Sequence, residues 1–254
     1  MDIQFFGAAK MVTGSNYLIK TDKYNVLIDC GMFQDSAEKE RLNYENFPYE
    51  PRNIDYLILS HAHIDHSGRI PKLIKDGFRG KIITTKPTYD LCKIMLRDSA
   101  KIQEADVEWE NRKRQRAGKK SIEPLYTVEE AEVSLKFFET YLYDQKIIVN
   151  EDIQLKFRDA GQMLGSAIIE LWIEEKGESI KLVFSGDLGM LNRPIINNPE
   201  YIDRADYLII ESTYGDTIHE RFGQSAEKLV GIINNTVLRG GTVIIPSFAV
   251  GRTQ

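Results

Sequence analysis

A hexapeptide in the first quarter of the chain concentrates metal-binding side chains. His61, His63 and His66 are three of the chain's four histidines, and Asp65 adds a carboxylate between them. They follow the apolar run 56–60, which is typical of a buried strand that ends in a loop. Imidazole and carboxylate together suit Zn²⁺ and similar divalent ions. The pattern therefore predicts a metal site, and a histidine-rich surface turn is the weaker interpretation.

One hexapeptide cannot supply every ligand of a metal centre, so further donors must come from elsewhere. Asp187 follows an apolar run and the pair Ser185-Gly186, a position from which its carboxylate could bridge two metal ions. Asp29 follows the apolar run 24–28 and could orient a ligand histidine through a hydrogen bond. A turn without chemical function is the alternative for Asp29.

Short strands and tight turns are the elements that must position these residues. Apolar runs bounded by glycine, lysine or acidic residues predict strands on both sides of a central segment. We expect these strands at residues 3–6, 15–20, 24–29, 55–60, 81–85, 146–150, 153–157, 167–174, 179–185, 207–211 and 242–246. A short helix opens near residues 68–71, and residues 224–238 form another helix.

The central segment, about residues 88–145, has helical periodicity instead, with apolar residues such as Leu91, Ile94 and Ile102 recurring at helical spacing. Thr127 and Glu130 have the form of a capping box and predict the start of a second helix. Residues 111–120 contain six lysines or arginines and no acid. This basic run is either a solvated helix end or a patch that contacts phosphate.

Composition is that of a soluble globular protein, with 28% charged and 42% hydrophobic residues. The net charge of −5 argues against a broadly basic nucleic-acid surface and leaves room for a local basic channel. Two cysteines, Cys30 and Cys92, provide no disulfide framework and fit a reducing cytoplasm. No run approaches the roughly 20 apolar residues of a membrane span, and the first residues lack a signal peptide's pattern. These features predict a cytoplasmic protein.

The motif His61-x-His63-x-Asp65-His66, preceded by Asp29 and followed by Asp187, resembles the metallo-β-lactamase superfamily. Three further segments resemble its β-CASP branch, which contains RNA-processing nucleases such as ribonuclease J and the nuclease subunit of the pre-mRNA 3′-end cleavage complex. These segments are residues 159–167, 211–216 and 241–254. The resemblance extends from Gly7 to Gln254.

The resemblance implies an α/β fold, an αββα sandwich with two zinc ions at its mouth, manganese being the alternative metal. His61 and His63 would hold the first ion, Asp65 and His66 the second, and Asp187 would bridge them. The implied reaction is hydrolysis of an RNA phosphodiester by an activated water that Asp65 helps to orient. Glu211 matches the first acidic motif of the branch, and its implied role is to orient a histidine general acid.

The chain departs from the family pattern in two places. The family has a histidine ligand of the first metal after Asp159-Ala160-Gly161, whereas this chain has Gln162, a weaker ligand. The chain also ends where a helix of the β-CASP domain is expected to begin, before the general-acid histidine. We therefore expect an incomplete metallo-β-lactamase domain over residues 1–211, with the helical insertion at about 88–145, and a truncated β-CASP domain over 212–254.

The leading prediction is a zinc-dependent ribonuclease whose activity is impaired by Gln162 and by truncation. The alternatives are an inactive scaffold that binds RNA or a partner, and another hydrolase on the same fold, such as a DNA nuclease or phosphodiesterase. The predicted partners are single-stranded RNA and either a second copy or a nuclease complex, with no membrane. Weaker candidates for substrate contact are Ser166, His219 and Arg252.

Overall fold

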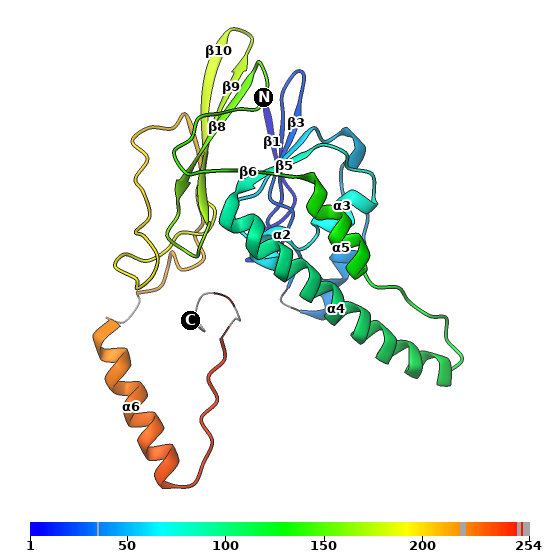
Figure 1. Cartoon of the computed structure of the whole chain (residues 1–254), viewed down its shortest axis with the longest axis vertical. Helices are drawn as coiled ribbons and strands as arrows, with labels where there is room; N and C mark the ends of the chain where they lie inside the picture. The colour runs from blue at the N-terminus through cyan, green and yellow to red at the C-terminus, as the bar shows by residue number, and fades with distance from the viewer. Residues whose placement is uncertain (35, 219–221, 248–249, 251–254) are drawn as a thin grey trace. The chain divides into compact units, whose positions relative to one another are not determined.

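Two β-sheets form the framework of the first of two compact units, Met1–Glu211, and the second unit is Ser212–Gln254 (Figure 1). The structure is a computed structural model that describes residues 1–34, 36–218, 222–247 and 250.

The first sheet has six strands that neighbour one another in chain order. Strands β1 to β3 pair antiparallel, and β3 to β6 pair parallel. Because parallel strands end at the same edge of a sheet, the loops that follow β3 and β4 lie next to each other. The strands are β1 (Asp2–Phe5), β2 (Tyr17–Lys20), β3 (Asn25–Ile28), β4 (Tyr56–Ile58), β5 (Lys81–Thr85) and β6 (Phe138–Tyr141).

The second sheet has five strands in the order β11-β10-β9-β8-β7. Only β10 and β11 run parallel; the other neighbours are antiparallel. The strands are β7 (Ile147–Ile148), β8 (Ile153–Asp159), β9 (Ala167–Glu175), β10 (Glu178–Phe184) and β11 (Tyr207–Ile209).

The hydrophobic core lies between the two sheets. Along β8, Ile153, Leu155 and Phe157 are fully buried and alternate with partly exposed residues, which is the period of a strand with one face in the core. They belong to one cluster with Ile19 and Ile28 of the first sheet. The core therefore joins the strands that lead into the predicted metal-site loops.

Helices cover the face of the six-stranded sheet that points away from the five-stranded sheet (Figure 1). Thr85 caps the longest of them by accepting a hydrogen bond from the Thr88 N–H. The predicted capping box of Thr127 and Glu130 is confirmed. These helices are α2 (Ile64–Ser67), α3 (Ile70–Lys75), α4 (Lys86–Arg116) and α5 (Val128–Ser134). Shorter helical turns are α1 (Ala37–Glu40), η1 (Arg41–Tyr44), η2 (Pro51–Asn53) and η3 (Leu135–Phe137).

Two secondary-structure predictions were wrong. Residues 242–246 have no strand neighbour among the described residues and form no strand. The segment predicted to be helical contains strand β6, which pairs with β5 through partners such as Ile82 and Phe138. β6 has only four residues, all partly exposed, so it lacks the alternation by which a strand can be recognised in sequence.

The second unit contains α6 (Phe222–Leu238), close to the helix predicted at 224–238. Leu229, Val230 and Ile232 of this helix are exposed. Among the described residues, none of the helices combines the length and the apolar character that crossing a membrane requires.

Candidate metal centre

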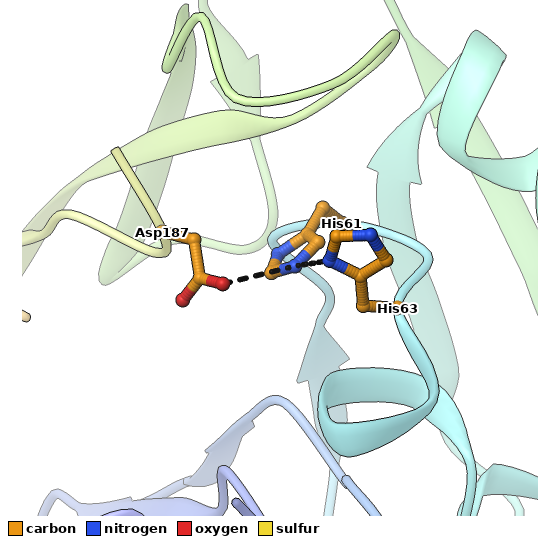
Figure 2. Close-up of side chains that lie close together, drawn as sticks. All are labelled: His61, His63 and Asp187. Carbon is orange, nitrogen blue, oxygen red and sulfur yellow. Dashed lines mark hydrogen bonds and ion pairs between the residues drawn. The ribbon is translucent and has the colours of Figure 1, made fainter. Parts of the chain in front are cut away.

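Three predicted ligands converge at one end of the sandwich (Figure 2). His61 and His63 lie in the loop after β4, and Asp187 lies in the loop after β10. One ligand atom from each residue lies within 4.8 Å of the others. His61 Nε2 is 3.0 Å from His63 Nδ1 and 3.7 Å from Asp187 Oδ2. The two sheets thus bring together side chains that are more than one hundred residues apart in the sequence.

Two further predicted ligands lie nearby: His66 lies against the Asp187 carboxylate, and Asp65 lies beside His66. His66 Nε2 is 3.2 Å from Asp187 Oδ1 and 3.8 Å from Asp65 Oδ2. Both residues are on the one-turn helix α2, which begins directly after His63. One oxygen of Asp187 therefore faces His61 and the other faces His66, so the carboxylate could be shared between two metal ions.

Asp29 is the buried anchor of the histidine loop. Its carboxylate accepts hydrogen bonds from the Ser60 N–H at 2.8 Å, from the hydroxyls of Ser60 and Ser15 at 2.9 and 3.0 Å, and from His66 Nδ1 at 2.7 Å. The residue has a φ of 55°, a left-handed conformation that Asp tolerates better than most residues. This geometry fixes the His66 ring, and the orientation of a ligand histidine by Asp29 stays a prediction.

The network also favours one orientation of each imidazole. With Nδ1 of His66 donating to Asp29, the Nε2 atom faces Asp187 and Asp65. The Ser60 hydroxyl lies 3.1 Å from His61 Nδ1 while it donates to Asp29, so its oxygen can accept a hydrogen bond from a protonated Nδ1. Nε2 of His61 is then left with its lone pair toward the other ligands, as metal binding requires.

Burial and charge separate the pKa values of the histidines. Burial lowers the pKa of His61 well below its ordinary value, and the nearby His66 lowers it further. Burial by itself would lower the pKa of His66, but the carboxylates of Asp29 and Asp187 raise it well above its ordinary value. Burial by itself would raise the pKa of Asp187, but the hydrogen bond and the charge of His66 lower that pKa below its ordinary value. The carboxylates of Asp29 and Asp187 thus favour the charged form of the His66 imidazole, whereas metal binding requires its ligating nitrogen to be without a proton.

Gly31 allows the loop after β3 to pack directly on the histidine loop. A Cβ at this position would lie 1.5 Å from the carbonyl oxygen of Asp65. The two backbones are joined by hydrogen bonds from Cys30 N–H to His66 O and from Met32 N–H to Ile64 O. Only glycine permits this approach, so Gly31 holds the histidine loop in place.

Gln162 lies beside the predicted first-metal ligands. Its side-chain Nε2 is 3.0 Å from His63 Nδ1, and its Oε1 is buried without a hydrogen-bond partner among the described residues. The amide is therefore located where the resemblance expects a histidine ligand.

The loop that carries Asp187 is held by Glu211 and Gly189. The Glu211 carboxylate accepts a 2.8 Å hydrogen bond from the Leu188 N–H, and its own N–H donates to Ser185 Oγ. A Cβ on Gly189 would lie 1.6 Å from the carbonyl oxygen of Gly161, so this loop packs directly on the Gln162 loop. Glu211 is thus placed to position Asp187, a contact that sequence reasoning missed.

The weaker substrate-contact candidates fare differently. Ser166 is fully buried, and its hydroxyl accepts hydrogen bonds from the N–H groups of Gln162 and Met163 at 3.1 and 3.2 Å. This favours a role in shaping the loop over contact with substrate. His219 and Arg252 lie outside the described residues.

The basic run 111–120 spans the C-terminal end of α4 and the residues that follow it. Arg112 and Arg114 pair with Glu108 and Glu110 one turn earlier, at 3.7 and 3.8 Å. These helix-surface pairs favour the interpretation of a solvated helix end.

Comparison with known proteins places this geometry in a family. The family model of the metallo-beta-lactamase superfamily matches residues 10–140. The chain belongs to this superfamily. The predicted α/β sandwich is therefore confirmed as a metallo-beta-lactamase fold.

Several curated proteins are similar to this chain along essentially its whole length. Ribonuclease TTHA0252 of Thermus thermophilus is 35% identical over 100% of the chain and 53% of its own length. An RNase J-like protein of Methanocaldococcus jannaschii is 32% identical over 99% of the chain and 52% of its own length. Transcription termination factor FttA of the same organism is 32% identical over 99% of the chain and 38% of its own length. The chain thus spans about half the length of the first two.

Membership in this superfamily implies divalent metal binding, and the side chains fit that expectation. Two donors of one tetrahedral zinc lie about 3.3 Å apart, given bonds of 2.0–2.1 Å. The 3.0 Å between His61 Nε2 and His63 Nδ1 is close to that separation. The Gln162 amide lies beside them with its Nε2 3.0 Å from His63 Nδ1, so exchanging its nitrogen and oxygen would add an oxygen donor there.

Proposed function

We propose that this chain carries the metal centre of a metal-dependent ribonuclease of the β-CASP branch, with two zinc ions. One observation carries the proposal: donor atoms of His61, His63 and Asp187 converge within 4.8 Å in a chain that is 35% identical to a ribonuclease. Relatives named for RNA cleavage or for transcription termination support RNA as the substrate.

Each side chain has a role in this proposal. His61, His63 and Gln162 would hold the first ion and Asp65 and His66 the second, with Asp187 shared between them. When bound, the ions would supply Lewis-acid stabilisation of the charge that develops on the phosphate and lower the pKa of a water. Asp65 is partly exposed, with 22% of its side chain accessible, and can accept a hydrogen bond from the attacking water.

Glu211 contributes through the Asp187 loop in this proposal. Its carboxylate holds the Leu188 N–H next to Asp187, so it positions the shared carboxylate. The role that the family resemblance implies, orienting a histidine general acid, is compatible with this contact because one carboxylate can accept several hydrogen bonds.

Residues 212–254 would be the beginning of the β-CASP domain, which in this branch covers the site and binds single-stranded RNA. Assembly as a homodimer or within a nuclease complex stays a prediction. Cys30 and Cys92 are both free and buried, which agrees with the reducing cytoplasm in which we place the protein.

A catalytically inactive scaffold is the second candidate, and Gln162 favours it. An amide oxygen is a weaker zinc ligand than a neutral imidazole, so the first zinc site would be impaired. The other predicted ligands support a working site, because the chain keeps all five of the acidic or histidine side chains His61, His63, Asp65, His66 and Asp187.

The test is cleavage of end-labelled single-stranded RNA by the protein that the whole gene encodes. The native form and Gln162→His are each assayed with Zn²⁺ or Mn²⁺, with Asp187→Asn as the metal-site control. We expect Gln162→His to cut in zinc, the native form to cut more slowly, and Asp187→Asn or added chelator to abolish cutting. RNA binding without cutting by either form would favour the scaffold, and absence of both would contradict an RNA-directed function.

A further inference from the structure

We propose that Gln162 shifts the selectivity of the first metal position away from zinc and toward harder divalent ions, Mn²⁺ above all. The inference rests on the proposed metal-dependent function of the same site. It concerns a ratio of affinities and not the affinity for zinc alone.

The position of the Gln162 amide is the first step. Its Nε2 lies 3.0 Å from His63 Nδ1, and its Oε1 is buried without a hydrogen-bond partner among the described residues. The oxygen and nitrogen of a carboxamide are nearly the same size, so a rotation exchanges them within the same space. Gln162 can therefore place its carbonyl oxygen where its Nε2 now lies, beside His63 Nδ1.

The loop holds the amide at this place. Ser166 is fully buried, and its hydroxyl accepts hydrogen bonds from both Gln162 N–H and Met163 N–H. Gly161 has a φ of +63°, and an added Cβ would lie 2.7 Å from the carbonyl oxygen of Asn197. The backbone of Gln162 is thus fixed on both sides, and its side chain is a built part of the site.

The donor set then decides the selectivity. With Gln162 the first position offers two imidazole nitrogens, from His61 and His63, and two oxygens, from Gln162 and Asp187. A histidine in place of Gln162 would give three nitrogens and one oxygen. Imidazole suits zinc, whereas carbonyl and carboxylate oxygens suit manganese, magnesium and calcium. By the Irving–Williams order zinc is still bound more tightly than manganese, but the ratio of the two affinities becomes smaller.

The experiment measures dissociation constants for Zn²⁺ and Mn²⁺ separately, on the metal-stripped 254-residue protein, by competition with a chromophoric chelator. The native protein is compared with Gln162→His. Leu164→His is the matched control. Leu164 is 57% exposed on the same loop, so the substitution adds an imidazole outside the site. Circular dichroism confirms that each variant is folded.

We expect Gln162→His to lower the zinc dissociation constant by at least about tenfold and the manganese constant by less than about threefold. Leu164→His should leave the ratio of the two constants within about twofold of native. An equal gain for both ions, or an unchanged zinc constant, would overturn the proposal.

Gln162→Glu is the second variant, because it keeps an oxygen donor and adds charge. It should strengthen manganese binding at least as much as zinc binding. A zinc gain about tenfold larger than the manganese gain would also overturn the proposal. None of these measurements uses RNA, so they can succeed even when the ribonuclease assay fails. If no RNA is cut but the affinity ratios are as predicted, the proposed function is rejected and the proposed metal selectivity is retained.

Discussion

The two sides of the metal centre are built differently. On one side, His61, His63 and His66 come from one continuous segment, the loop after β4 and the helix α2, and the buried Asp29 carboxylate accepts three hydrogen bonds from Ser60 and His66 of that segment and a fourth from Ser15. On the other side, Gln162 and Asp187 come from two separate loops, after β8 and β10. These loops are held by backbone contacts and by the partly exposed Glu211.

The difference indicates where this site is preorganised and where it can vary. Ligand atoms of the histidine side have their orientation set by buried polar partners, and such networks are stabilising only when every group is satisfied. The side that bears Gln162 contains a buried oxygen with no hydrogen-bond partner among the described residues. We infer that the histidine side determines whether the site exists and the other side determines which ion it selects.

Asp29→Ala is expected to have the largest effect. It leaves the buried His66 and the N–H of Ser60 without their acceptor, and removing one partner of a buried pair destabilises by about 3–5 kcal/mol. Asp29→Asn keeps an acceptor oxygen and tolerates the positive φ, so it should lose clearly less stability than Asp29→Ala. Urea denaturation measures both. Equal losses for the two variants would contradict an anchoring role for the carboxylate.

Glycine substitutions compare the two sides directly. Gly31→Ala would bring Cβ to 1.5 Å from Asp65 O, and Gly189→Ala to 1.6 Å from Gly161 O. Each substitution should lower the free energy of unfolding by about 3 kcal/mol or somewhat less. The loss should be larger for Gly31→Ala, because Gly31 packs on the histidine loop, which is held by more hydrogen bonds.

The control for these glycine variants is Gly231→Ala in helix α6, where an added Cβ meets nothing within 4 Å. It should be neutral or stabilising by up to about 1 kcal/mol. If Gly189→Ala proves the more damaging of the two site variants in urea denaturation, the contrast between a rigid and an adjustable side is wrong.

Glu211→Ala should have a moderate effect of about 1–2 kcal/mol, because it leaves the Leu188 N–H without an acceptor. Glu211→Gln retains an acceptor oxygen and should keep native metal affinity, while Glu211→Ala should weaken it. Isothermal titration with Zn²⁺ measures the difference. Equal zinc affinity in the native protein, Glu211→Gln and Glu211→Ala would contradict the proposal that Glu211 positions Asp187.

Ser60→Ala should have the smallest effect, about 1 kcal/mol, since Asp29 keeps three of its four hydrogen bonds. Its informative consequence is on His61, whose Nδ1 loses a hydroxyl 3.1 Å away. Nitrogen NMR of the imidazole should show a mixture of tautomers in Ser60→Ala and one tautomer in the native protein and in Ser60→Thr. An unchanged spectrum would exclude Ser60 from orienting His61.

Local sequence patterns singled out side chains that the structure brings together, His61, His63 and Asp187, and most of the elements around them. The strand β5 has the predicted bounds, and the capping box at Thr127 starts α5 as expected. Contacts between distant loops could not be predicted in this way. In the sequence Gly31 has the pattern of an ordinary turn glycine, and only the structure shows its close contact with Asp65. Ser60 likewise has the pattern of a strand end, and only the structure shows its hydrogen bonds to Asp29. The contact of Glu211 with Leu188 likewise depends on how β10 and β11 pair.

The most direct test of the metal centre is anomalous diffraction at the zinc edge from crystals of the protein grown with Zn²⁺. We predict an anomalous peak bounded by His61 Nε2, His63 Nδ1 and the carboxylate of Asp187, and a second peak at Asp65 and His66. The peak at His61 should disappear in Asp187→Asn. A fully occupied zinc bound elsewhere on the chain, with no peak between these three residues, would contradict the proposed site.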